Sequence, residues 1–192
     1  MKKTVSTTEK IKSALYELLL SKTIEETEVS EICENAMVSR RTFYNHYSDK
    51  YAATEDIFKS LFDKYVYISS PLTFRLFVER TSVLTKEHML FLKNTIYYTG
   101  QNSLENAFAE NLQYAFFQIL DDAGWKQEND PFLLCSIACN ELSHTISRLL
   151  YVMLAEYKYD TCTNNATKNN TSLSGFEIMK SLIPVVLTKY FF

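Results

Sequence analysis

Apolar residues recur along the first third of this chain at the spacing of short helices. Ser6 and Glu9 form the pattern of a capping box, and the apolar positions behind them lie three or four residues apart, which predicts a helix ending near Ser21. The apolar positions between residues 29 and 36 predict a second helix of two turns, with Thr27 as its N-cap.

A third short helix is predicted over about residues 40–47. Ser39 precedes it and can cap it, and its apolar positions Phe43 and Tyr47 are expected to point inward. Two short helices joined by a tight turn, with supporting helices on either side, form a helix-turn-helix unit of about 50 residues.

The rest of the chain predicts longer helices. One of them, over about residues 49–68 with Ser48 or Asp49 as its cap, links a three-helix head at residues 1–50 to a larger helical body at residues 51–192. The body helices are expected at about residues 72–83, 86–98, 103–123, 131–157 and 173–192. The predicted fold class is all-α.

Composition favours the same class. The chain of 192 residues holds 3 Gly and 3 Pro, whereas average usage would give about 14 and 10. Tight turns and glycine-rich phosphate loops need these residues, so a Rossmann fold, a β-sandwich and a P-loop enzyme are disfavoured. The formal net charge is −3, and residues 1–65 hold 10 Lys or Arg against 11 Asp or Glu. Any contact with DNA must therefore be made by a local group of positive side chains rather than by an overall positive charge.

Other chemistry finds little support in the residue pattern. The cysteines lack the paired spacing of a zinc site and are expected to be reduced thiols of a cytoplasmic protein; they are Cys33, Cys135, Cys139 and Cys162. The longest apolar run, residues 149–155, is too short to span a bilayer, so no membrane partner is expected. Glu141 and His144 have the spacing of a di-iron ligand pair, but no second pair accompanies them, and we expect no metal, no cofactor and no enzymatic activity.

The stretch TEVSEICENAMVSRRTFYNHYSDKYA, residues 27–52, resembles the DNA-binding segment of TetR-type bacterial transcriptional regulators. The resemblance combines the second helix, the V-S turn, a T-F-Y-x-H-Y recognition helix and the D-K-Y opening of the fourth helix. The S-D-K-Y sequence and the overall size are also similar to the DhaS-like branch of this family. One departure is Met37, because these regulators usually have glycine there, in a turn that often needs a left-handed backbone.

The third helix is therefore expected to enter the major groove of double-stranded DNA by its N-terminal end. A guanidinium of Arg40 or Arg41 can bind guanine O6 and N7, and Thr42 offers a hydroxyl and a methyl group. Tyr44, Asn45 and His46 can reach phosphates or bases farther along. The resemblance implies DNA contacts at Arg40, Arg41, Thr42, Tyr44, His46 and Lys50, of which Lys50 would hold a phosphate.

The body is expected to form a homodimer, because one recognition helix reads too few base pairs and two copies read a pseudo-palindromic operator. The last two predicted helices are apolar around much of their circumference and are the expected interface; a monomer that buries them in its own core is the alternative. An effector pocket is expected among His88, Tyr97, Tyr98, Phe108, Phe117 and His144, although an aromatic stripe is also typical of plain core.

The function predicted from sequence is that of a transcriptional regulator, a repressor that a small-molecule or protein effector releases from DNA, with activation as a further possibility. Two alternatives remain open at this point. One is a helical metal-binding or enzymatic protein that uses Glu141 and His144, and the other is an interaction module whose head has lost DNA binding.

Overall fold

The computed structural model describes residues 5–68 and 72–122 of the chain. Within these ranges the protein is all-α, as predicted, and contains no strand. The helices are α1 (Thr7–Leu19), α2 (Val29–Ala36), α3 (Arg40–His46), α4 (Lys50–Tyr65), α5 (Phe74–Glu87), α6 (Met89–Thr95) and α7 (Leu104–Asp122).

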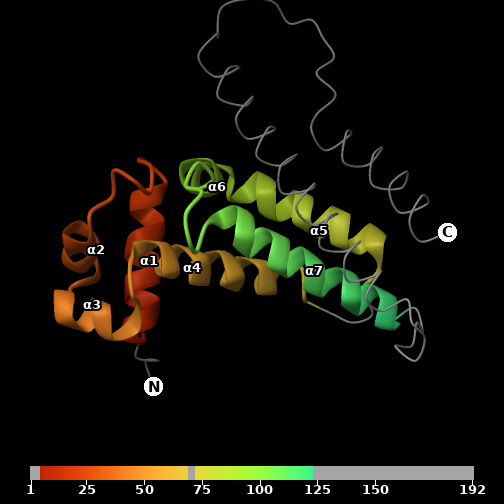
Figure 1. Cartoon of the computed structure of the whole chain (residues 1–192), viewed down its shortest axis with the longest axis horizontal. Coiled ribbons are helices and arrows are strands. Elements are labelled where there is room, and N and C mark those ends of the chain that lie inside the picture. The colour runs from red at the N-terminus through yellow and green to blue at the C-terminus, as the bar shows by residue number, and fades with distance from the viewer. Residues whose placement is uncertain (1–4, 69–71, 123–192) are drawn as a thin grey trace, which may run out of the picture.

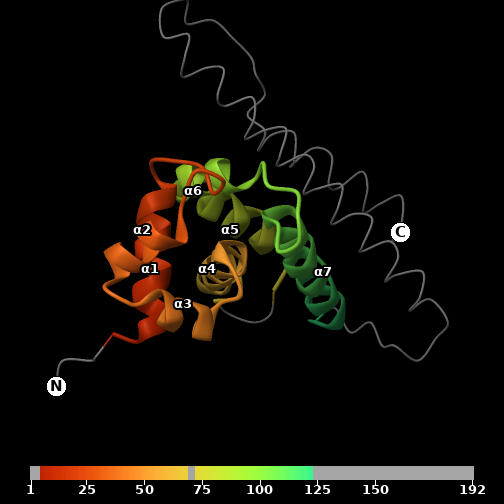
Figure 2. The ribbon, with the colours of Figure 1, turned by 60° about the vertical axis from the view of Figure 1, so that its left-hand side comes forward.

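Helices α1, α2 and α3 form one end of the described structure, the head, and α5 and α7 lie at its other end (Figure 1). Helix α4 packs against α1 in the head and also against α5 and α7. Figure 2 looks almost along α4 and shows it between α1 on one side and α7 on the other. Helix α4 therefore packs against both the head and the body helices.

The predicted start of α1 is confirmed, while that of α2 is wrong by one residue. The Glu9 N–H donates to the Ser6 hydroxyl at 3.1 Å, so Ser6 caps α1. Thr27 does not cap α2, because its side chain is buried and its hydroxyl donates to the Thr23 carbonyl at 2.9 Å. Glu28 occupies the N-cap position instead, and its N–H donates to the Glu31 carboxylate at 2.9 Å.

Helices α3 and α4 begin as the sequence indicates. The Ser39 hydroxyl accepts from the Thr42 N–H at 3.0 Å and caps α3. Of the two candidates for the cap of α4, the structure selects Asp49, whose carboxylate accepts from the Ala52 N–H at 2.7 Å. Helix α4 ends at Tyr65, three residues before the predicted end.

The body helices partly match their predicted bounds. The break between α5 and α6 falls at His88 rather than at residues 84–85, because His88 leaves the helical conformation with φ −112° and ψ 24°. Helix α7 agrees with the predicted helix at residues 103–123 to within one residue at each end. The predicted helices at 131–157 and 173–192, and with them the expected dimer interface, lie outside the described residues.

One cluster of buried side chains, which runs through the head and the body helices, holds these helices together. In the head, fully buried apolar residues come from all three helices: Ile11, Leu15, Leu19, Ile32 and Phe43. Between α4, α5 and α7 the core is aromatic, with the ring of Phe62 6.3 Å from that of Phe77 and 6.1 Å from that of Phe108. Such ring pairs add to the free energy gained from burying apolar area, so they fix the direction of α4 relative to the body helices.

Candidate nucleic-acid interface

The turn between α2 and α3 keeps the left-handed conformation although it lacks glycine. Met37 has φ 55° and ψ 47° and follows the last residue of α2. Its N–H donates to the Glu34 carbonyl at 3.1 Å, and the next N–H, that of Val38, donates to the Cys33 carbonyl at 3.0 Å. These bonds satisfy carbonyls at the end of α2, which a helix otherwise leaves without partners. The unusual residue has therefore not changed the form of the turn.

The inner face of α3 is anchored in the core of the head, as predicted. Phe43 is fully buried, and Tyr47, directly after the helix, is also buried. The Tyr47 hydroxyl donates to the Asp56 carboxylate of α4 at 2.6 Å, and burial together with this bond raises the pKa of Tyr47 far above its usual value. The middle and the C-terminal end of the inner face are thus fixed, which sets the angle at which α3 is presented.

The outer face of α3 carries the side chains that are expected to contact DNA. Arg40, Arg41, Tyr44, Asn45 and His46 are all exposed, and Thr42 is half-buried. Its hydroxyl makes a 2.8 Å hydrogen bond with that of Ser39.

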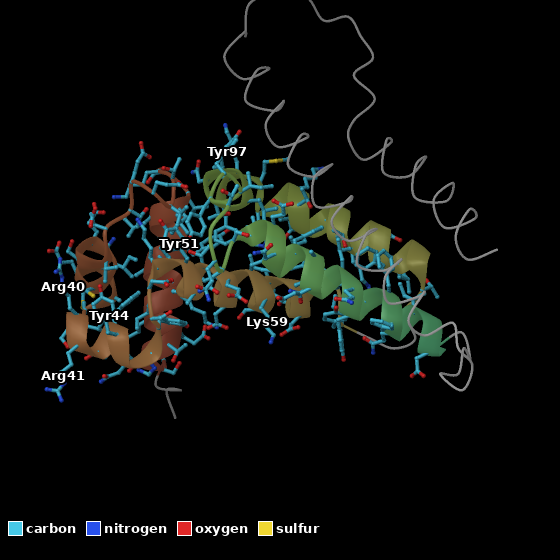
Figure 3. All side chains as sticks on the ribbon, viewed as in Figure 1. Arg40, Arg41, Tyr44, Tyr51, Lys59 and Tyr97 are labelled. Carbon is cyan, nitrogen blue, oxygen red and sulfur yellow. The ribbon has the colours of Figure 1, made fainter. Side chains whose placement is uncertain are left out.

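In Figure 3, Arg40 and Arg41 extend from the outer end of the head, away from the body. The first turn of α3 holds no acidic residue, so the two positive charges meet no carboxylate within their own turn. Long cationic donors at an exposed helix N-terminus are the groups that proteins use to read guanine in the major groove.

Lys50 has a structural role that the sequence did not indicate. Its ammonium group donates to the Glu25 carbonyl at 3.0 Å and to the Thr27 carbonyl at 2.8 Å. These carbonyls lie in the segment before α2, so Lys50 ties the start of α4 to the start of the helix-turn-helix. The two bonds use two of the three N–H groups that an ammonium carries. Every residue has a backbone carbonyl, so the residue types at these positions do not reveal that the carbonyls accept from Lys50. The sequence pattern therefore could not predict this role.

The residues expected to form an effector pocket have different surroundings in the described structure. Phe108 is buried in the aromatic core, where its ring lies 5.7 Å from that of Phe58. The Tyr98 ring stacks on that of Tyr51 at 3.6 Å. Tyr97 is exposed, Phe117 is half-buried on α7, and His144 lies outside the described residues.

His88 does line a cavity, of about 260 Å³, which opens to the surface between α1 and α4. The other lining residues come from these two helices: Glu9, Lys12, Ser13, Tyr16, Ile57, Ser60 and Leu61.

A chain of hydrogen bonds passes through His88 and joins three helices. The Tyr16 hydroxyl of α1 lies 2.7 Å from Nδ1 of His88, and the Tyr65 hydroxyl of α4 lies 3.1 Å from Nε2. Tyr65 donates its proton to the Glu87 carboxylate, so its oxygen can only accept from an Nε2–H of His88. The neutral ring then accepts the Tyr16 proton at Nδ1. Burial lowers the pKa of His88, which favours this neutral form.

Helix α6 is bonded to the head by a second set of contacts. The Asn94 side-chain amide donates to the Leu19 carbonyl at the end of α1, at 2.9 Å. The Asn94 carbonyl accepts from the Ile24 N–H, also at 2.9 Å. Neither contact has a signal in the sequence. Together with the His88 chain they fix the head against the body at two positions along α1.

The described residues contain no group of three or more His, Cys, Asp or Glu side chains placed to hold a metal ion. Glu141 and His144, the pair considered from sequence, lie outside the described ranges. Over residues 5–68 and 72–122, none of the helices combines the length and apolar character needed to cross a bilayer.

The described residues define an all-α protein with a helix-turn-helix unit at one end. No family model matches the chain, and no curated protein matches it in sequence. Among solved structures, the fold is similar to that of a protein described as "Dihydroxyacetone kinase operon activator DhaS", with a TM-score of 0.63 and 16% sequence identity over 96% of this chain and 96% of that chain. At this level of identity the similarity shows the fold.

Proposed function

We propose that this protein is a sequence-specific, DNA-binding transcriptional regulator. The observation that carries the proposal is the division of α3 into two faces. Phe43 and Tyr47 anchor the inner face in the head, while Arg40 and Arg41 stand exposed at the N-terminal end of the outer face. A helix fixed in this way can be inserted into a major groove without rearrangement of the head.

Each exposed side chain of α3 has a role in this proposal. Arg40 and Arg41 bind guanine O6 and N7, and Thr42 contacts a thymine methyl group. Tyr44, Asn45 and His46 reach phosphates or bases farther along the groove. Lys50 places its remaining N–H toward a phosphate. The contacts to bases give specificity, whereas the contacts to phosphates give affinity that depends on salt.

The proposed regulator acts as a homodimer in the cytoplasm. Residues 1–50 read the DNA, and residues 51–192 bind an effector and pair through the last two helices. Two heads about 34–36 Å apart, or a multiple of one helical turn, match the two halves of a pseudo-palindromic operator. A small-molecule or protein effector then releases the protein from a promoter that it represses. The effector does so by binding more tightly to the conformation in which the distance between the two heads does not match the operator.

The solved structure with the similar fold is described as an operon activator. A reporter gene downstream of the operator therefore decides the sign of regulation: deletion of the regulator raises expression if it represses and lowers expression if it activates.

The DNA-binding proposal is tested by selecting bound sequences from genomic fragments and measuring their affinity by fluorescence anisotropy over a range of salt concentrations. Arg41→Ala is expected to weaken operator binding by about 1–3 kcal/mol, roughly 5- to 150-fold, and to change binding to random DNA much less. Lys59→Ala is the matched control, because Lys59 is an exposed cation on α4, away from α3 (Figure 3).

If the wild-type protein binds operator and random DNA equally weakly at low salt, the proposal is wrong. An interaction module that has lost DNA binding would then explain the neutral charge balance of the head. Stoichiometric iron or zinc in the purified protein would instead favour the metal-binding alternative.

A further inference from the structure

Met37 combines two features that are each unfavourable for the isolated chain. Its backbone adopts the left-handed conformation with φ 55°, which costs a residue with a Cβ more than it costs glycine. Its side chain is large and apolar, and the residue is 91% exposed. With so little of the residue covered, packing inside the head does not offset the cost of the backbone.

The position of Met37 suggests what does offset it. The residue lies two positions before Ser39, the N-cap of α3, and three before Arg40. Met37, Ser39 and Arg40 are all exposed, while Val38 between them is half-buried and packs against the core of the head. A recognition helix that enters the groove by this end brings the preceding turn to the edge of the groove, where the sugars and phosphates of one strand run.

We propose that Met37 makes an apolar contact with a deoxyribose of the DNA backbone when α3 is seated in the major groove. This inference rests on the proposed DNA-binding function and adds a contact that carries no charge. A methionine side chain suits such a contact, because it is unbranched, flexible and polarisable and can follow the surface of a sugar. Methionine rather than glycine is then kept at this left-handed position for function, at the expense of stability.

The test compares Met37→Gly and Met37→Leu with the wild-type full-length protein. Met37→Gly relieves the backbone and removes the side chain, so we expect a thermal midpoint about 2–4 °C higher and an operator affinity about 3- to 10-fold lower. Met37→Leu keeps an apolar side chain and is expected to stay within 2-fold of wild-type affinity. The slope of affinity against salt is expected to be the same in all three proteins, because an apolar contact releases no counterion.

Asn102→Gly is the matched control, since Asn102 is the other non-glycine residue with positive φ among the described residues, at 60°, and lies outside the head. It is expected to leave operator affinity unchanged. The inference is overturned if Met37→Gly binds the operator as tightly as wild type, if Met37→Leu loses as much affinity as Met37→Gly, or if the loss comes with a lower salt slope. A wild-type protein without operator binding would overturn the proposed function as well, and the wild-type titration alone shows which of the two has failed.

Discussion

The link between the head and the body through Tyr16 can be tested by removing one oxygen atom. Tyr16→Phe deletes the hydroxyl that lies 2.7 Å from Nδ1 of His88. It keeps the ring, which stacks on Phe91 with a centroid distance of 5.3 Å, so the buried apolar area is almost unchanged. The measured effect therefore reports the hydrogen bond rather than a cavity in the core.

The expected size follows from the surroundings of the bond. A neutral hydrogen bond contributes about 0.5–1.5 kcal/mol to stability, and leaving a buried partner unsatisfied costs about 1–3 kcal/mol. Tyr16 and His88 are half-buried and line a cavity that opens to the surface, so water can reach Nδ1 in the variant. The range for a neutral hydrogen bond therefore applies, rather than the cost of an unsatisfied buried partner. We expect Tyr16→Phe to reduce the free energy of unfolding by about 1 kcal/mol.

The assay is urea unfolding followed by circular dichroism, at one protein concentration because the stability of the proposed dimer would depend on concentration. A double-mutant cycle with His88→Phe isolates the pair, and the two changes should be non-additive by about 0.5–1 kcal/mol. Tyr67→Phe is a useful comparison, because the Tyr67 hydroxyl donates at 2.9 Å to the Asn111 carbonyl, away from α1. If Tyr16→Phe and His88→Phe add within about 0.3 kcal/mol, the two side chains do not act as a pair and the reasoning is refuted.

Two further predictions concern His88 and Lys50. Burial lowers the pKa of His88 in the folded protein, with Glu87 opposing the shift and Lys64 adding to it, so the unfolded state binds more protons than the folded state. The stability from this group is complete above the unfolded pKa of about 6.5 and is lost as pH falls from there through the lower folded pKa. As pH is lowered from 7.5 to 5.5, the urea midpoint should therefore fall more steeply for wild type than for His88→Gln. Equal dependence of the two midpoints on pH would contradict this. Lys50→Met removes bonds to two carbonyls and is expected to lower the free energy of unfolding by about 1–2 kcal/mol. In anisotropy titrations it should also reduce the salt slope of DNA binding by about one unit, and a purely structural role would leave the slope unchanged.

The sequence by itself determined the order of the described helices and the starts of α1, α3 and α4. Ser6, Ser39 and Asp49 cap α1, α3 and α4 through bonds to an N–H three residues ahead, and such bonds form wherever the local sequence allows them. The inward positions of Phe43 and Tyr47 also followed from spacing alone, because one face of a helix repeats every three or four residues. The exposed residues of the candidate interface were selected from the same short segment.

Only the tertiary structure decided how these helices are joined. Tyr16 and His88 are 72 residues apart in the chain, and no local pattern connects them. The same holds for the stacking of Tyr51 on Tyr98 and for the bonds from Lys50 to carbonyls of the preceding segment. Thr27 is different, since the bond that keeps its hydroxyl from capping α2 is local and runs to the Thr23 carbonyl four residues earlier. Helix caps and periodicity act over a few residues, whereas the other contacts exist only after packing has brought distant segments together.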